Sequence, residues 1–186
     1  MGTSQEPVVR RFTADEALRM VELGIIGEDE HLELLDGVLV EMSPQGTEHA
    51  EAIANLDDRL RAAYPGARRI RPQTPLALGK YDLPEPDFAV VRAEPGTFRR
   101  RHPTGPETVL VVELAWSSQG RDRRKAALYA AGGVEVYWLL DLAARTLEVR
   151  TAPADGAYQV TRVLAEDDVV ELPETEVRLA VRELLP

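Results

Sequence analysis

Residues 109–141 read VLVVELAWSSQGRDRRKAALYAAGGVEVYWLLD, and this stretch decides the fold. Apolar runs at its two ends, residues 109–115 and 134–141, predict two buried strands. Between them we expect a helix over residues 121–131, because Gly132-Gly133 follows it and glycine commonly ends helices. Strand, helix and strand together take about 33 residues, which is the length of one parallel crossover.

A shorter helix and a hairpin precede this unit. Thr13 and Glu16 have the spacing of a capping box, in which each side chain satisfies a free backbone amide, so we expect a helix from there to about Leu23. Asp36-Gly37 lies between two short apolar runs, and this dipeptide is the strongest local signal for a β-hairpin. The N-terminal region is therefore predicted to be a helix followed by a hairpin.

The remaining elements follow from the spacing of apolar residues. Ile53, Leu56 and Leu60 recur at helical spacing, which predicts a helix from about Thr47 to Ala63. Residues 93–106 are polar and contain three prolines and two glycines, so a loop is expected there. Further strands are predicted at residues 67–73, 75–78, 88–92, 146–151, 158–164 and 169–172.

These elements predict the α/β (α+β) class, with a mixed central sheet that is flanked by β-hairpins. The 186 residues are expected to form a single domain, residues 1–186. Within it we distinguish an N-terminal helix and hairpin (12–45), a core (47–141) and a β-rich C-terminal extension (142–186).

Composition excludes several classes of protein and site. Hydrophobic residues make up 44% of the chain, enough for a real core, yet no apolar run approaches the roughly 20 residues of a membrane-spanning helix. The N-terminus has no basic segment followed by an apolar one, so we expect no secretory signal and a cytoplasmic protein. The absence of cysteine excludes disulfides, thiolate metal ligands and a cysteine nucleophile.

Arginine dominates the basic residues. Of 22 basic side chains 20 are Arg, and the lysines are Lys80 and Lys125. The single asparagine, the 13 prolines and the lack of cysteine fit a thermophile, and a GC-rich genome would give the same bias. Each lysine is therefore a residue type that the chain otherwise avoids.

Charge is distributed unevenly along the chain. The net charge of −10 argues against a general nucleic-acid-binding protein. Residues 59–125, however, carry 14 basic and seven acidic side chains, whereas the rest carries eight basic and 25 acidic ones. The basic side chains form three clusters: Arg68, Arg69 and Arg71; Arg99, Arg100 and Arg101; and Arg121, Arg123 and Arg124 with Lys125. They predict either a face that contacts phosphates or solvated arginines paired with the acidic flanks.

Two carboxylates lie where neighbouring strands would bring them together. Asp87 stands at the entry of the strand predicted over residues 88–92, and Glu113 lies inside the apolar strand at 109–115. A buried carboxylate is costly unless it is paired or bound to a metal. If the two strands are neighbours, the pair suits a hard cation such as Mg²⁺ or Mn²⁺.

Lys125 and Tyr129 are four residues apart and share one face of the helix that follows. Each candidate also has a structural interpretation. Asp87 would then be a turn residue at a strand entry, and Glu113 would pair with an arginine. Lys125 would lie on a solvated helix surface, and Tyr129 would pack in the core. The choice depends on whether these side chains meet.

Several sequence blocks keep a fixed order along residues 12–151. They are Glu33-Leu34-Leu35-Asp36-Gly37, Met42-Ser43-Pro44 with His49, Pro86-Asp87-Phe88-Ala89-Val90-Val91, Val111 to Ser118, Lys125-Ala126-Ala127-Leu128-Tyr129 and Gly133 to Asp141. This ordered set resembles the "putative restriction endonuclease" family, a domain of unknown function that is abundant in cyanobacteria. The family lies within the PD-(D/E)XK nuclease superfamily.

The resemblance implies a restriction-endonuclease-like core with the element order αβββαβ, in which the helix at 47–63 comes first. It also implies that Asp87 and Glu113 are metal ligands and that Lys125 is the catalytic lysine. Glu33 and His49 match family positions near the site.

The chain departs from the pattern in two places. The usual superfamily lysine lies two residues after the second acid, where this sequence has Ala115, so the lysine is expected to reach the site from the following helix at Lys125. Trp116 stands where the family tends to have a small residue and a proline around the serine.

Two functions are consistent with these residues. The first is Mg²⁺-dependent hydrolysis of DNA phosphodiester bonds by Asp87, Glu113 and Lys125, with the basic clusters on the DNA backbone. Its auxiliary residues would be Glu33, His49 and Tyr129. The second is a catalytically silent nuclease fold that binds a protein partner, which an arginine plugging the two carboxylates would favour.

Duplex cleavage requires two strand cuts, which favours a homodimer or a higher even oligomer. Alternating apolar residues in the C-terminal region are expected to form an edge that pairs with another chain. They include Leu147, Val149, Val160 and Val163.

Overall fold

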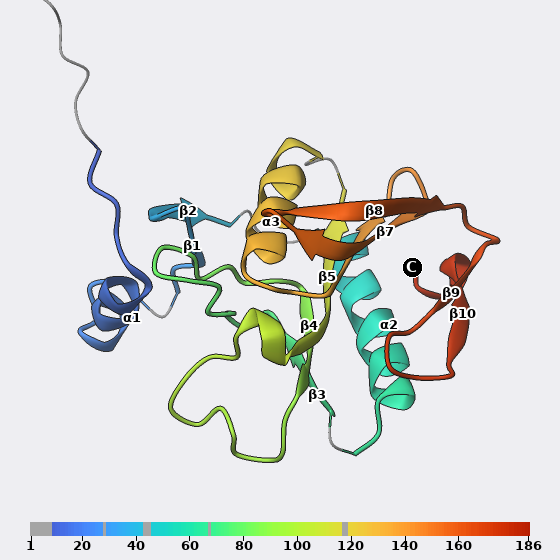
Figure 1. Cartoon of the computed structure of the whole chain (residues 1–186), viewed down its shortest axis with the longest axis horizontal. Helices are drawn as coiled ribbons and strands as arrows, with labels where there is room; N and C mark the ends of the chain where they lie inside the picture. Colours follow the sequence, from blue (N-terminus) through green and yellow to red (C-terminus); the bar gives the residue numbers. More distant parts are fainter. Residues whose placement is uncertain (1–8, 28, 43–45, 67, 117–118) are drawn as a thin grey trace, which may run out of the picture.

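A six-stranded mixed sheet forms the centre of the molecule (Figure 1). The computed structural model describes residues 9–27, 29–42, 46–66, 68–116 and 119–186. The strands lie in the order β3-β4-β5-β6-β7-β8, and within the sheet only β5 and β6 run parallel. Their bounds are β3 Arg68–Pro72, β4 Phe88–Arg92, β5 Thr108–Ala115, β6 Val136–Asp141, β7 Thr146–Ala154 and β8 Ala157–Leu164.

The parallel crossover predicted from residues 109–141 is present. Helix α3 (Gln119–Ala131) connects β5 to β6, and Val111 and Glu113 pair in register with Tyr137 and Leu139. Helix α2 (Thr47–Ala63) precedes β3, so the order α2-β3-β4-β5-α3-β6 is αβββαβ. The predicted fold class and core order are therefore confirmed.

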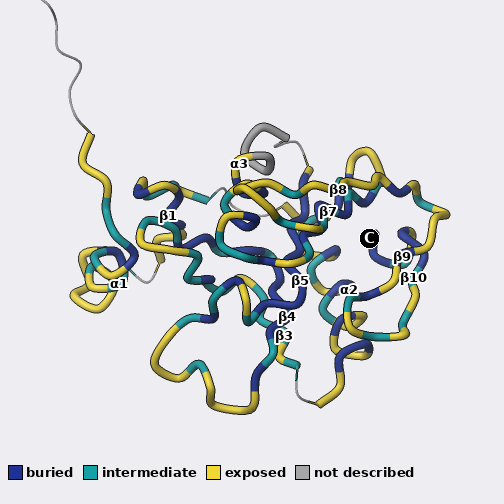
Figure 2. Tube along the Cα trace, in the orientation of Figure 1, coloured by how far each residue is buried: buried dark blue, intermediate teal, exposed yellow. Residues whose placement is uncertain are grey.

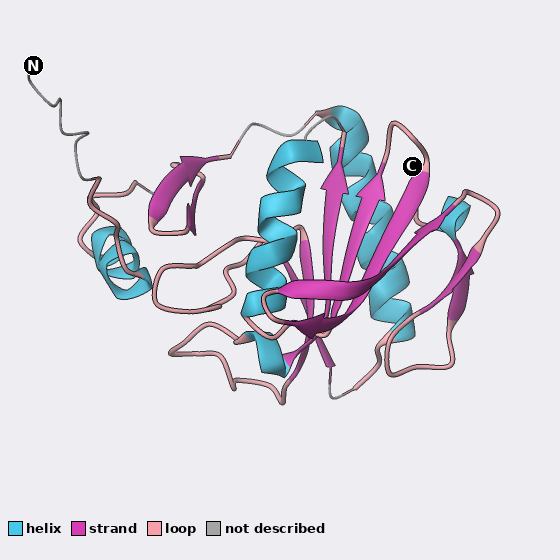
Figure 3. Cartoon of the chain, turned by 45° about the horizontal axis from the view of Figure 1, so that its top comes forward, coloured by secondary structure: helices cyan, strands magenta, loops and turns pink. Residues whose placement is uncertain are grey.

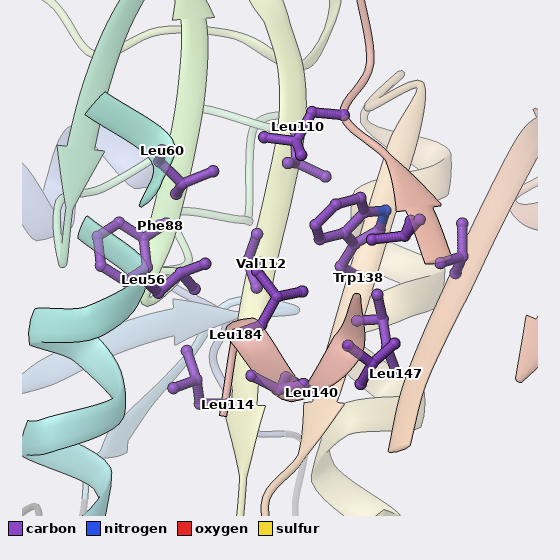
Figure 4. Packing of buried hydrophobic residues seen from close by; sticks show 14 of the residues in the cluster. Leu56, Leu60, Phe88, Leu110, Val112, Leu114, Trp138, Leu140, Leu147 and Leu184 are labelled. Carbon is purple, nitrogen blue, oxygen red and sulfur yellow. The ribbon is translucent and has the colours of Figure 1, made fainter. Parts of the chain in front are cut away.

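The two faces of the sheet are covered by different elements (Figure 3). One face packs against α2 and the C-terminal segment, which contains β9 (Val169–Glu171), β10 (Arg178–Ala180) and the short 3₁₀ helix Val181–Glu183. Trp138 and Leu147 are fully buried in this larger cluster (Figure 4). The other face packs against α3 through residues such as Ala126 and Tyr129.

The N-terminal helix and hairpin lie to one side of the sheet (Figure 1). Helix α1 (Ala14–Glu22) begins with the predicted capping box of Thr13 and Glu16. Strands β1 (Leu32–Leu35) and β2 (Val38–Glu41) form the predicted hairpin, and φ is positive at Asp36 and Gly37, as a tight two-residue turn requires. Leu34 forms a bridge with Leu83, which ties β1 to the loop before β4.

Two expectations need correction. Residues 75–78 form no strand beyond an isolated bridge between Ala77 and Thr104, because Pro75 has no amide to donate and the positive φ of Gln73 turns the chain away from β3. Leu147 and Val149 do not form an exposed edge, since both are buried in β7 on the face that packs against α2. The central strands β4 and β5 are buried along nearly their whole length (Figure 2).

Strand β7 pairs with β6 and β8 pairs with β7, so the sheet continues past residue 142. No helix within the described ranges is long and apolar enough to cross a membrane.

Candidate active site

The pairing of β4 with β5 brings the two candidate carboxylates side by side. These strands are antiparallel, with Phe88 opposite Val112. Continuing this register by one residue places Asp87 opposite Glu113. Residues 89 and 111 of the same row pack in the cluster beneath α3, so by alternation both carboxylates lie on the α3 face.

Asp87 is held by contacts to both of its carboxylate oxygens. His49, in the first turn of α2, places its Nε2 3.1 Å from Asp87 Oδ1. The amide of Leu114 donates to Oδ2 at 2.8 Å. The hydrogen bond to Asp87 raises the pKa of His49. A helix from one face of the sheet thus fixes a carboxylate that belongs to the other face.

Glu113 is buried and accepts from two side chains of α3. Its Oε1 lies 2.8 Å from Lys125 Nζ and accepts from the Tyr129 hydroxyl at 2.6 Å. Burial raises the pKa of Glu113 to about 7 against the opposing charge of Lys125, and the Asp87 carboxylate adds to the rise. Burial also raises the pKa of Tyr129 well above its ordinary value, so its phenol stays a hydrogen-bond donor.

Lys125 forms a second ion pair, to the N-terminal hairpin. Its Nζ lies 2.9 Å from Glu33 Oε2, and the Glu33 and Lys125 side chains are 1% and 6% exposed. Burial alone would lower the pKa of Lys125, but the negative charges of Glu113 and Glu33 more than reverse this and raise it. The ammonium therefore stays charged inside the protein. The solvated-helix interpretation of Lys125 is wrong.

Glu85 is a residue of this group that the sequence reasoning missed. Its backbone amide donates to Glu33 Oε2 at 3.4 Å. The carboxyl is partly buried, and burial together with the nearby charge of Glu33 raises its pKa. The sequence did contain a signal for Glu85: it stands two residues before Asp87, just ahead of the strand at 88–92. In an extended segment this spacing places two side chains on the same side.

The geometry therefore unites one lysine, one histidine and several carboxylates from α2, α3, β1, β5 and the entry of β4. Residues 14–182 match the family described as "Putative restriction endonuclease" (Uma2). The chain belongs to this family. The resemblance drawn from the ordered sequence blocks is thereby confirmed.

A solved structure shares the fold. It is described as a putative nuclease belonging to DUF820 from Anabaena variabilis, and it covers 96% of this chain and 97% of its own with a TM-score of 0.67. Sequence identity is 19%, so this likeness establishes the fold alone. None of the curated proteins matches the chain.

The donor set of the Uma2 chain fits a hard divalent cation. Asp87 and Glu113 meet where Glu33 and Glu85 add further negative charge and Lys125 supplies one buried ammonium. Among the described residues no group of three or more His, Cys, Asp or Glu side chains could hold a metal. Mg²⁺ needs only one or two protein carboxylates and completes its shell with water and phosphate, so two ligands suffice.

Two of the three arginine clusters, Arg68–Arg71 and Arg99–Arg101, are not gathered around this site. Because β4 runs from Asp87 away to Arg92, the loop that carries Arg99–Arg101 leaves the sheet at the end opposite Asp87 (Figure 1). Arg68 and Arg101 are ion-paired with Glu174 and Glu107.

The other candidate arginines differ in their surroundings. Arg71 lies partly buried over the ring of Phe98, whereas Arg69, Arg99, Arg100 and Arg124 are exposed. Arg124 lies on α3 directly before Lys125, so its cluster is the one at the end of the sheet where Asp87 and Glu113 lie. The side chains of Arg121 and Arg123 lie outside the described residues.

Proposed function

We propose that this protein is a Mg²⁺-dependent endonuclease that hydrolyses DNA phosphodiester bonds. The observation that carries the proposal is the contact of Lys125, from α3, with Glu113, which the strand register places opposite Asp87. Two adjoining carboxylates and an ammonium are the groups that phosphodiester hydrolysis at a PD-(D/E)XK-type site needs. Mn²⁺ would serve in the same place.

The position of Lys125 supports a migrated lysine. Ala115, two residues after Glu113, is buried in the cluster beneath α3 and lies in the same cluster as Ala126. A lysine at position 115 would compete for this space, whereas Lys125 enters from the helix and ends 2.8 Å from Glu113. The lysine ammonium thus reaches Glu113 from helix α3 instead of from strand β5.

Each side chain has a distinct role in this proposal. Asp87 and Glu113 would hold the cation, and Mg²⁺ would supply a water of lowered pKa and neutralise charge on the phosphate. Lys125 stabilises the negative charge that develops on the phosphate or orients the attacking water. His49 and Tyr129 orient the two carboxylates, and Glu33 fixes Lys125.

A catalytically silent nuclease fold would be favoured by an arginine that pairs with Asp87 and Glu113. Among the described side chains, no arginine is hydrogen-bonded or ion-paired to Asp87 or Glu113; the cation at Glu113 is Lys125. The arrangement therefore favours the enzyme.

The test is nicking of supercoiled plasmid in Mg²⁺ or Mn²⁺. Asp87→Asn, Glu113→Gln and Lys125→Met are each expected to lower the rate by about 100-fold or more. Lys80→Met is the matched control, because it removes the other lysine, which is exposed, and it should leave the rate unchanged. Circular dichroism verifies that each variant is folded.

Calorimetric titration with Mn²⁺ separates the roles. Asp87→Asn should lose Mn²⁺ affinity, whereas Lys125→Met should keep or increase it, since it removes a nearby positive charge. Cleavage by Lys125→Met at the native rate, or cleavage that persists in excess chelator, would contradict the proposal.

A further inference from the structure

One aromatic side chain stands apart from all the others. The chain has ten aromatic residues, and the structure describes every one of them. Nine are buried or partly buried, among them Trp138, which is fully enclosed in the core. Trp116 is 51% exposed. Leaving a large indole in water forgoes the stabilisation that its burial would give, so its exposure calls for an explanation.

Trp116 stands at the candidate active site. It directly follows the last residue of β5 and is three residues from Glu113. It is also only two residues from Leu114, whose amide donates to Asp87. At the rise of a strand this separation is about 7 Å along the backbone.

The site is most open on the side of Asp87. The side chains of Asp87 and His49 are 13% and 18% exposed, against 6% for Lys125 and 1% for Glu33. A phosphate entering the site therefore comes in beside Asp87. The backbone amide that fixes Asp87 belongs to the same short segment as Trp116. By strand alternation Trp116 follows Leu114 on the face covered by α2, the helix from which His49 reaches Asp87.

We propose that Trp116 stacks on an unpaired nucleobase of the DNA strand whose phosphate occupies the Asp87–Glu113 site. This inference rests on the proposed nuclease function and names its substrate: single-stranded or locally unpaired DNA. An indole face can stack only on a base whose own face is free, and such stacking does not depend on sequence.

The charge of the chain indicates that base stacking, more than attraction to phosphates, would supply affinity for DNA. The chain carries a net charge of −10, and the loop with Arg99–Arg101 leaves the sheet at the end away from Asp87. Attraction to phosphates is therefore weak for a nucleic-acid-binding protein. Stacking on an aromatic ring contributes affinity without a net positive charge.

The experiment measures binding without cleavage. An end-labelled oligothymidylate and a blunt duplex of the same length are titrated by fluorescence anisotropy in Ca²⁺, and electrophoresis verifies that the DNA stays intact. Trp116→Ala should raise the Kd for the single strand by roughly 5- to 100-fold and change that for the duplex less than about twofold. Trp116→Phe, which keeps a stacking face, should recover most of the affinity.

Intrinsic fluorescence provides an independent readout. The protein has two tryptophans, and Trp138 is shielded in the core, so the single strand should quench Trp116 alone. Trp116→Phe should abolish the quenching. Val21→Ala, which trims an exposed apolar residue on α1, is the control and should change neither signal.

The outcomes distinguish this inference from the proposed function. If the wild type binds the single strand but Trp116→Ala binds it equally well, base stacking is refuted while the nuclease proposal stands. The same holds if Trp116→Ala alters only the oligomeric state in sedimentation, because Trp116 would then be a protein contact. If the wild type binds no DNA of either form, both proposals fail.

Discussion

Lys125 carries a positive charge into the interior, where Glu33 and Glu113 hold it at 2.9 and 2.8 Å. Such a group is tolerable only because two carboxylates lie close to it. Removing it leaves two buried carboxylates that must protonate or draw in water. The residue that we propose as catalytic is therefore also a structural one, and its loss has a cost that can be measured without any substrate.

Lys125→Met is expected to lower the free energy of unfolding by about 3 kcal/mol in metal-free buffer, measured by urea denaturation. Lys80→Met removes an exposed lysine and should change it by less than about 0.5 kcal/mol. Adding Glu33→Gln to Lys125→Met should restore part of the loss, because one fewer buried charge is left unpaired. A double variant as unstable as the sum of the two single variants would show that the residues do not act as a unit.

Glu107 provides a pH-dependent contribution away from the site. Hydrogen bonds from Arg101, at 2.6 and 2.7 Å, lower its pKa from 4.5 to about 2. The unfolded chain takes up this proton at higher pH than the folded one, so the stabilisation is full above about pH 4.5 and disappears as the pH falls through about 2. Urea denaturation of wild type and Glu107→Gln should differ at neutral pH and converge towards pH 2. A difference that stays constant over that range would rule out this pair as the cause.

At the level of single residues, the candidate site residues could be identified from the sequence, but the residues that they contact could not. Asp87, Glu113 and Lys125 are residue types that an apolar strand or an arginine-rich chain does not otherwise favour, so they were recognisable. The register that puts Asp87 opposite Glu113 is a pairing between segments 26 residues apart, which local patterns do not encode. The contact of Glu85 with Glu33 on a distant hairpin was hidden for the same reason, although its spacing from Asp87 was visible in the sequence.

The elements with strong local signals were predictable from the sequence. The capping box at Thr13, the Asp36-Gly37 turn and the apolar runs of the crossover each depend on neighbours within a few residues. The segment at 75–78 was not predictable in the same way. Its residues suit a strand, but the turn at Gln73 and the missing amide of Pro75 prevent a regular ladder. Its backbone bonds are isolated ones, to the carbonyls of Asp82, Pro84 and Pro103.

The junction between the 3₁₀ helix Gly105–Glu107 and the end of α3 depends on the absence of a side chain. A Cβ at Gly105 would lie 2.0 Å from the backbone oxygen of Gly132, which cannot move aside as a side chain can. We expect Gly105→Ala to lower the free energy of unfolding by at least about 2 kcal/mol. Gly79→Ala is the control, because nothing lies within 4 Å of its added Cβ, and should leave stability nearly unchanged. Thermal denaturation followed by circular dichroism compares the two, and equal midpoints would contradict the crowding argument.

At the scale of the whole molecule, the two edges of the sheet differ in how they resist pairing. Edge strand β3 carries Arg68, Arg69 and Arg71 and ends at Pro72, and both charges and proline discourage another strand from adding to an edge. The opposite edge, β8, has Arg162 as its one charged residue. The unprotected edge is therefore β8.

Val160 and Val163 of β8 are 46% and 65% exposed, which makes this strand suited to join a second copy of the chain. We propose a homodimer, or a higher even oligomer, that pairs along β8 and holds two sites in one assembly. Sedimentation of the wild type at micromolar concentration should give an even oligomer. Val163→Lys should shift it to monomer, because a charge on this exposed strand would lose part of its water when a second strand pairs with it. Arg69→Lys, on the already charged edge, should leave the assembly intact. A wild-type monomer across this range would refute pairing through β8, and each chain would then act with its single site alone.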